Sequence, residues 1–302
     1  MKRVLFIFLL FFSVFAYAEQ LLPTQFLNFN GLDIAVYETK GNKGPGILLI
    51  HGNTSSASSY SKFFKTNYAK RNRIVAVELP GFGLSDRSVF YDVGFFVDAI
   101  VFVAEELNLD EGVLVGWSLG GDLALQASTS LPDLKGIFTF GTAPVGYDPG
   151  LPPPFLTPEE SYAGEAVNYG FIPDLTNEQI DDYVTAFFRP GFSPIPDFFF
   201  DDGYNTDPLT RAAVGTAAAG LDPSFQDEIE IIRNLEIPVS LVIGSEDFVV
   251  RPEFLQALEV SVPTLFTEET IILYNTGHAI HWEKPNLFQE LLKAFVLSAV
   301  EN

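Results

Sequence analysis

Short apolar runs alternate along this chain with stretches in which apolar residues recur at helical spacing. The runs at 46–50, 113–115, 136–141 and 239–243 are almost continuously apolar, which is typical of strands buried on both faces of a parallel sheet. Between them, 91–107 places apolar residues three and four positions apart, as in a helix with one buried face. The alternation predicts an α/β fold, a mostly parallel twisted sheet flanked by helices.

A hairpin is expected before the first buried run. Residues 25–30 and 32–38 alternate apolar and polar positions and are joined by Asn30-Gly31, a strong signal for a tight turn between antiparallel strands. The other expected elements are helices at 58–70, 252–260 and 285–300 and strands at 73–78 and 270–274.

The alternation stops between 146 and 235. This stretch is rich in proline, aromatic and acidic residues, among them the run 152–154 of three prolines and the run 198–200 of three phenylalanines. Aromatic residues at helical spacing must pack on something, so a disordered linker is not expected. We predict a helical cap inserted between sheet strands, at 146–235, over a core formed by 19–145 and 236–302.

The first eighteen residues have the pattern of a secretory signal. Lys2 and Arg3 precede an apolar stretch at 4–15, and Ala16-Tyr17-Ala18 forms a small-x-small cleavage site. A signal peptide at 1–18 predicts export to the periplasm or the extracellular space, with no stable membrane anchoring after cleavage. An uncleaved anchor is the alternative, although a membrane span needs about 20 apolar residues.

The composition of the chain excludes several classes of binding partner and of catalytic or metal site. The chain has 17 Lys and Arg against 39 Asp and Glu, a net charge of −22, which repels nucleic acid and anionic lipid. It has no cysteine, which excludes disulfides, thiol nucleophiles and thiolate metal sites. His51, His278 and His281 are the only histidines, too few for a multi-histidine metal site, so we expect no metal and no cofactor.

The most informative motif is Gly116-Trp117-Ser118-Leu119-Gly120-Gly121, because of its context. An apolar run precedes it and a helix-favouring run follows it, so Ser118 is expected on a sharp strand-to-helix turn with its hydroxyl exposed. A serine nucleophile also needs a base, an acid that orients the base and donors for an oxyanion.

His278 is the candidate base, because it follows the end of a predicted strand. His281 is the alternative, and His51 is expected to shape an earlier turn. The candidate acid is Asp247, just past the strand at 239–243, with Glu246 as its rival. Catalytic groups of open α/β sheets gather at such strand ends, and the order serine, acid, histidine is the one that the α/β-hydrolase arrangement uses.

Two backbone amides are candidates for the oxyanion hole. One is that of Leu119, directly after the nucleophile. The other is that of Asn53, in the loop after the first buried strand, whose carboxamide is also a candidate substrate contact.

Taken together, the motifs resemble those of the α/β-hydrolase superfamily. They are, in chain order, His51-Gly52, Pro80-Gly81-Phe82-Gly83-x-Ser85, the Ser118 motif, Gly244-x-x-Asp247 and Gly277-His278. Residues 51–56, 116–121, 141–145 and 277–279 look like those of the metal-free N-acyl-homoserine lactonases of this fold. That resemblance implies lactone opening by a Ser-His-acid triad, with Asn53 in the oxyanion loop and a cap tyrosine at Tyr183. Tyr183 and Trp117 are thus candidate substrate-binding residues, and the alternative for Tyr183 is a packing role.

These observations predict a serine hydrolase that cleaves a small ester or lactone, with an apolar acyl part, through an acyl-enzyme. Alternatives on the same fold are a peptidase that releases N-terminal proline and a carbon-carbon bond hydrolase. The peptidase would require cap carboxylates to bind an ammonium. A ligand-binding protein without catalysis is the alternative from another class. The oligomeric state is not predicted.

Overall fold

One eight-stranded sheet organises the computed structural model, which describes residues 21–301. The strand order is β1-β2-β4-β3-β5-β6-β7-β8; β1 and β2 are antiparallel to their neighbours, and β3 to β8 are parallel. The strands are β1 (Gln25–Phe29), β2 (Leu32–Glu38), β3 (Lys43–Ile50), β4 (Asn72–Val77), β5 (Val113–Trp117), β6 (Gly136–Phe140), β7 (Val239–Gly244) and β8 (Ile271–Leu273). The predicted mostly parallel α/β sheet is confirmed.

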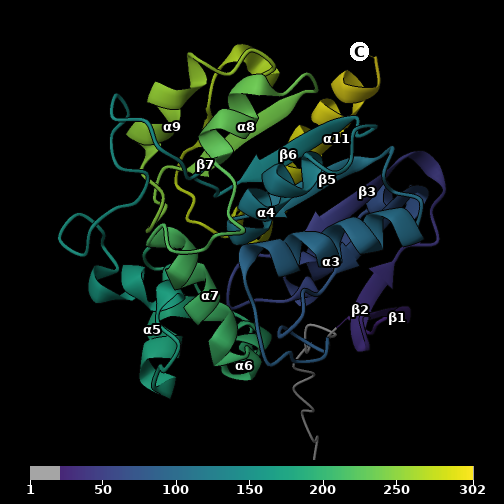
Figure 1. Cartoon of the computed structure of the whole chain (residues 1–302). Coiled ribbons are helices and arrows are strands. Elements are labelled where there is room, and N and C mark those ends of the chain that lie inside the picture. Colours follow the sequence, from purple (N-terminus) through teal and green to yellow (C-terminus); the bar gives the residue numbers. More distant parts are fainter. Residues whose placement is uncertain (1–20, 302) are drawn as a thin grey trace, which may run out of the picture.

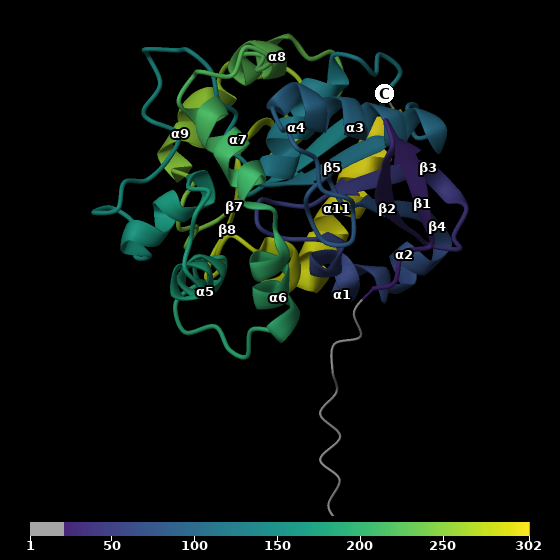
Figure 2. The same cartoon turned by 60° about the horizontal axis from the view of Figure 1, so that its bottom comes forward.

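Helices cover both faces of the sheet (Figures 1 and 2). On one face α3 (Val93–Glu106) packs against α4 (Leu119–Ser128), and α8 (Glu228–Asn234) also packs on α4. On the other face α11 (Pro285–Glu301) contacts β6, α1 (Ser61–Phe64) and α10 (Ile280–Glu283). The strands β3, β5, β6 and β7 are buried along most of their length, as their apolar runs require.

The segment between β6 and β7 folds mainly as helices. It contains η2 (Gly164–Phe171), α5 (Asn177–Ala186), α6 (Asp197–Asn205) and α7 (Pro208–Ala218), which gather beside one end of the sheet (Figure 1). We call residues 146–235 the cap. Its last helix, α8, joins the layer formed by α3 and α4.

The helix expected at 58–70 is broken into three short pieces. They are η1 (Ala57–Tyr60), α1 and α2 (Asn67–Arg71). Thr66 is extended and its hydroxyl accepts a hydrogen bond from Ala69 N at 3.2 Å, so it starts a new helix instead of continuing the first. α9 (Pro252–Glu259) and α11 lie where helices were expected.

In the part of the chain that the structure describes, no helix combines the length and apolarity needed to span a membrane. The predicted signal at 1–18 lies outside the described residues, so it stays a prediction.

Candidate active site

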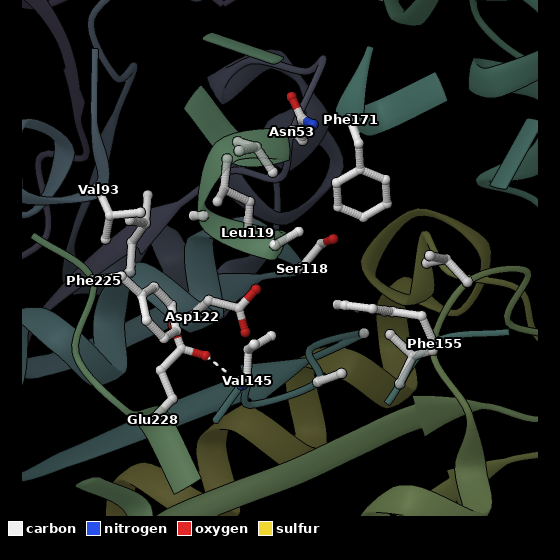
Figure 3. A pocket seen from close by; sticks show the side chains of 18 of the residues that line it. Asn53, Val93, Ser118, Leu119, Asp122, Val145, Phe155, Phe171, Phe225 and Glu228 are labelled. Carbon is white, nitrogen blue, oxygen red and sulfur yellow. Dashed lines mark hydrogen bonds between the residues drawn. The ribbon is translucent and has the colours of Figure 1, made fainter. Parts of the chain in front are cut away.

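Ser118 lies on a strained turn between β5 and α4. Its backbone has φ 54° and ψ −125°, a conformation that side chains rarely adopt. The turn is tight: a Cβ atom on Gly120 would overlap the backbone of Ile50, at the end of β3. Ser118 N donates to Phe140 O at 3.0 Å, which anchors the turn to β6. Its side chain is half-buried and faces a cavity (Figure 3).

His278 and Asp247 form a buried pair at the same end of the sheet. His278 Nδ1 lies 2.7 Å from Asp247 Oδ2, and both side chains are almost completely buried. Asp247 Oδ1 accepts from the backbone N–H groups of Val249 and Val250, each at 3.0 Å. The carboxylate therefore has a fixed orientation, with one oxygen held by the backbone and the other left for the imidazole.

The His278 ring lies next to the loop that anchors Ser118. A Cβ on Gly141 would lie 3.1 Å from ring atoms of His278, and Gly141 directly follows the residue that accepts from Ser118 N. Gly141 also lines the cavity with Ser118. The fold thus brings the ends of β5, β6, β7 and β8 together around the three predicted residues.

The alternative residues occupy other environments. His281 is buried among the rings of Trp117, Tyr60 and Phe140, and burial lowers its pKa to about 3. No hydrogen bond to either His281 ring nitrogen occurs within 21–301. His51 accepts from Leu79 N at 3.1 Å, and burial lowers its pKa to about 4. Glu246 has no described hydrogen bond to His278. The position next to Asp247 thus belongs to His278.

Trp117 packs against His278. It is 1 % exposed, and its Nε1 donates to His278 O at 3.1 Å. It is not among the residues that line the cavity. Burial next to the imidazole gives Trp117 a positioning role, and its predicted contact with substrate stays a prediction.

Both predicted oxyanion donors are adjacent to the cavity. Leu119 is the first residue of α4, where an amide has no acceptor within its own helix. Asn53 lines the cavity, and no hydrogen bond from its backbone amide occurs in the described part of the chain. Its carboxamide is already engaged, because Nδ2 donates to Gly170 O in the cap at 2.6 Å. The two free amides are therefore the available donors.

Tyr183 of α5 lines the cavity from the cap side. Its hydroxyl lies against Gly170, because a Cβ there would overlap the Tyr183 oxygen. Burial raises the pKa of the phenol, so it stays neutral and can donate a hydrogen bond. The ring also packs edge-on against Phe187 at 4.9 Å. The structure thus gives Tyr183 a packing contact and a place at the cavity wall.

The cavity beside Ser118 has a volume of about 80 Å³ and a mostly apolar lining. Phe155, Phe171 and Phe225 contribute aromatic walls (Figure 3). Two lining residues, Asp122 and Glu228, are acids that the sequence analysis missed. Asp122 follows Ser118 by one helical turn and lines the cavity together with Gln126, one turn further along α4.

Buried carboxyl groups also tie the cap to the core. Asp202 of α6 accepts from Ser56 Oγ at 2.6 Å, and Glu78 accepts from Leu84 N at 2.6 Å. Burial raises the pKa of Glu78 to about 7 and that of Asp202 to about 8. The charges of Glu78 and Asp201 add to the effect on Asp202, and Tyr37 hydrogen-bonds to Glu78.

We expect this cluster to make stability fall as the pH rises from about 4 to about 8. Because the folded-state pKa values are raised, the stabilisation is fully present below the unfolded-state values and is lost as the pH rises through about 7 and about 8. Asp202→Asn keeps an oxygen acceptor for Ser56 and removes one titration. It should reduce the decline by up to about 1.4 kcal/mol per pH unit.

Melting temperatures measured between about pH 4 and about pH 8 test this expectation. Asp182→Asn, at an exposed position on α5, is the matched control and should keep the wild-type slope. Equal slopes for Asp202→Asn and the wild type would show that another group controls the decline.

Comparisons with known proteins agree with this geometry. Residues 47–290 match the family model described as "Alpha/beta hydrolase family". The uncharacterized hydrolase YugF of Bacillus subtilis (strain 168) is 24% identical over 295 residues, which cover 92% of this chain and 99% of that protein. A pimeloyl-[acyl-carrier protein] methyl ester esterase of Shewanella sp. (strain MR-7) is 29% identical over 127 residues, 40% of this chain and 45% of the esterase.

Solved structures show the same fold. The N-acyl homoserine lactonase AidH, complexed with N-butanoyl homoserine, superposes with a TM-score of 0.81 at 24% identity, covering 92% of this chain and 97% of AidH. The esterase RhEst1 from Rhodococcus sp. ECU1013 gives a TM-score of 0.74 at 21% identity, with 92% and 99% coverage. The resemblance drawn from the motifs is confirmed at the level of the fold. With a family match spanning most of its length, this chain belongs to the alpha/beta hydrolase family.

Proposed function

We propose that this hydrolase cleaves small carboxylic esters or lactones by serine catalysis. One observation carries the proposal: a serine on a strained turn opens into an apolar cavity, next to a buried His278–Asp247 pair joined at 2.7 Å. A hydroxyl that is half-exposed between buried neighbours is suited to attack a carbonyl brought to the cavity.

Each residue then has a defined chemical role. Ser118 Oγ attacks the carbonyl carbon while His278 Nε2 takes the hydroxyl proton. The amides of Asn53 and Leu119 donate to the oxyanion of the tetrahedral intermediate. As that intermediate collapses, the leaving oxygen takes the proton from His278 and an acyl-Ser118 ester remains. Water, deprotonated by His278, attacks this ester and releases the acid and Ser118.

Asp247 orients the imidazole throughout. It accepts from His278 Nδ1–H, which leaves Nε2 free to face Ser118, and it stabilises the imidazolium that forms. Its own orientation is fixed by Val249 N and Val250 N.

The finer proposal is that short acyl groups, including those of N-acyl-homoserine lactones, are the preferred substrates. A cavity of about 80 Å³ is smaller than the roughly 300–1,000 Å³ of typical ligand sites. The fold shared with AidH, whose structure holds N-butanoyl homoserine, supports trying lactones first. Export to the periplasm or beyond, predicted from residues 1–18, remains a proposal for where the reaction takes place.

Covalent labelling by a fluorophosphonate, combined with a substrate panel, tests the proposal. We expect stoichiometric labelling of Ser118 and turnover of p-nitrophenyl esters and N-acyl-homoserine lactones, fastest for short chains. A protein that binds the lactones without labelling or turnover would instead be a ligand-binding member of the fold. Labelling with ester turnover and no lactone opening would restrict the function to esters.

A further inference from the structure

The cavity contains a carboxyl pair that the proposed reaction does not use. Asp122 of α4 and Glu228 of α8 line it together, and Figure 3 shows Asp122 between Ser118 and Glu228. The two carboxyl groups hydrogen-bond to each other, which requires a shared proton. No lysine or arginine is among the described residues that line the cavity.

Hydrogen bonds from other parts of the fold explain why Glu228 is buried, but no such bonds are described for the Asp122 side chain. Glu228 is completely buried. It accepts from Val145 N and from Gln126 Nε2, both at 2.7 Å. These bonds join α8 to α4 and to the loop that follows β6. By contrast, no described hydrogen bond within 21–301 has the Asp122 side chain as its acceptor, and its Oδ1 is buried without a hydrogen-bond partner. Leaving a buried polar group unsatisfied costs stability, so a group outside the protein is the natural partner.

Burial raises both pKa values. The charge of Glu228 and the hydrogen bond with it add to the rise for Asp122, whose pKa lies well above its usual range, whereas that hydrogen bond lowers the pKa of Glu228. Asp122 is then the acid that donates to Glu228. A protonated carboxyl that donates through one oxygen can still accept at the other. The second oxygen of the Asp122 carboxyl is therefore a hydrogen-bond acceptor to which no described residue donates.

We propose that Asp122 is a specificity-determining residue, which accepts a hydrogen bond from a hydroxyl group on the acyl chain of the substrate. This inference rests on the proposed serine hydrolase function and narrows its substrate class to hydroxyacyl esters and lactones. Asp122 follows Ser118 by four helical residues, about 6 Å along the axis. An acyl group on Ser118 spans that distance with a hydroxyl on its β- or γ-carbon. A substrate with a carboxylate in place of this hydroxyl would be repelled by Glu228.

Three esters of the same alcohol isolate this contact: the butanoate, the β-hydroxybutanoate and the β-methoxybutanoate. The methoxy group has the oxygen but cannot donate. We expect kcat/KM for the hydroxy ester to exceed the other two about tenfold or more, because a site built for a hydroxyl discriminates strongly against analogues that lack it. Equal values for the hydroxy and methoxy esters would overturn the proposal.

Two variants at position 122 distinguish the effect of losing the acceptor oxygen from the effect of losing the ionisable carboxyl group. Asp122→Asn can donate to Glu228 through Nδ2 and keeps an acceptor oxygen, so the hydroxy preference should survive. Asp122→Leu keeps the branched shape of the side chain and has no acceptor, so the ratio of hydroxy to methoxy kcat/KM should fall to about one. Asp98→Asn, an exposed site on α3, should keep the wild-type ratio. The ratio is independent of how much active protein each preparation contains.

A binding measurement keeps this inference separate from the catalytic one. β-Hydroxybutyramide should raise the melting temperature of the full chain more than butyramide does, and the difference should vanish in Asp122→Leu. That result, without turnover of any ester, would contradict serine catalysis and support the hydroxyl site. Ester turnover by a labelled Ser118, with no hydroxy preference and no difference between the amides, would leave catalysis standing and overturn the hydroxyl site.

Discussion

Ser118→Ala is expected to lower kcat for esters and lactones by about 10⁶-fold, close to the loss seen when a whole serine triad is removed. Without the hydroxyl there is no acyl-enzyme, and only the oxyanion amides of Asn53 and Leu119 remain to assist attack by water. Steady-state kinetics and loss of fluorophosphonate labelling both measure the effect. Ser130→Ala, at an exposed site just past the end of α4, is the matched control and should stay near wild-type activity.

The strained backbone at Ser118 predicts a second measurable effect of substitutions at this position, a change in the free energy of unfolding. Both serine and alanine must adopt φ 54° here, whereas glycine reaches that conformation without a Cβ clash. Ser118→Gly should therefore be as inactive as Ser118→Ala yet more stable than it, by about 1 to 3 kcal/mol of unfolding free energy. Full turnover by either variant would refute serine catalysis. Equal stability of the two would mean that the turn relaxes.

Local patterns along the chain were enough to predict the sheet and to place Ser118, Asp247 and His278 at one edge of it. β3, β5, β6 and β7 are buried on both faces, so each is an apolar run bounded by turn residues. Parallel strands place their carboxyl ends at one edge, which is why Ser118, Asp247 and His278 could be expected there together. The 2.7 Å contact of Asp247 with His278 follows from this topology.

Features made by contacts between distant segments could not be predicted in the same way. The hydrogen bond from Asn53 Nδ2 to Gly170 O joins residues 117 positions apart, and no periodicity reports it. The contact of Asp122 with Glu228 depends on how α8 docks on α4. The break at Thr66 was missed because an N-cap threonine and a mid-helix threonine look alike until the backbone conformation is known.

The cap forms part of the cavity wall beside Ser118, and its contacts explain why the sequence alone did not predict the substrate. Tyr183, Phe155 and Phe171 all line the cavity from cap segments. Each joins the cavity wall only through the folding of a segment whose pattern predicted helices but not their packing. The shape of the cavity is therefore determined by tertiary contacts, whereas the positions of Ser118, Asp247 and His278 follow from the turn and the strand ends.

Asp247→Asn is expected to lower kcat by about 10⁴-fold while leaving the fold intact. Val249 N and Val250 N hold one oxygen of residue 247, and an asparagine would keep its carbonyl oxygen there to accept these two bonds. Its NH₂ group would then point at His278 Nδ1. An N–H donor at that position favours the tautomer with the proton on Nε2, so the imidazole could no longer accept the Ser118 proton.

The rival carboxylate gives the control. Glu246→Gln changes the neighbouring side chain, which has no described bond to His278, and should alter kcat by less than about twofold. Circular dichroism and melting temperature establish that both variants are folded, and kcat with a short p-nitrophenyl ester measures the loss. If Glu246→Gln lost more activity than Asp247→Asn, the acid would have been assigned to the wrong residue, and the 2.7 Å contact of Asp247 with His278 would be structural only.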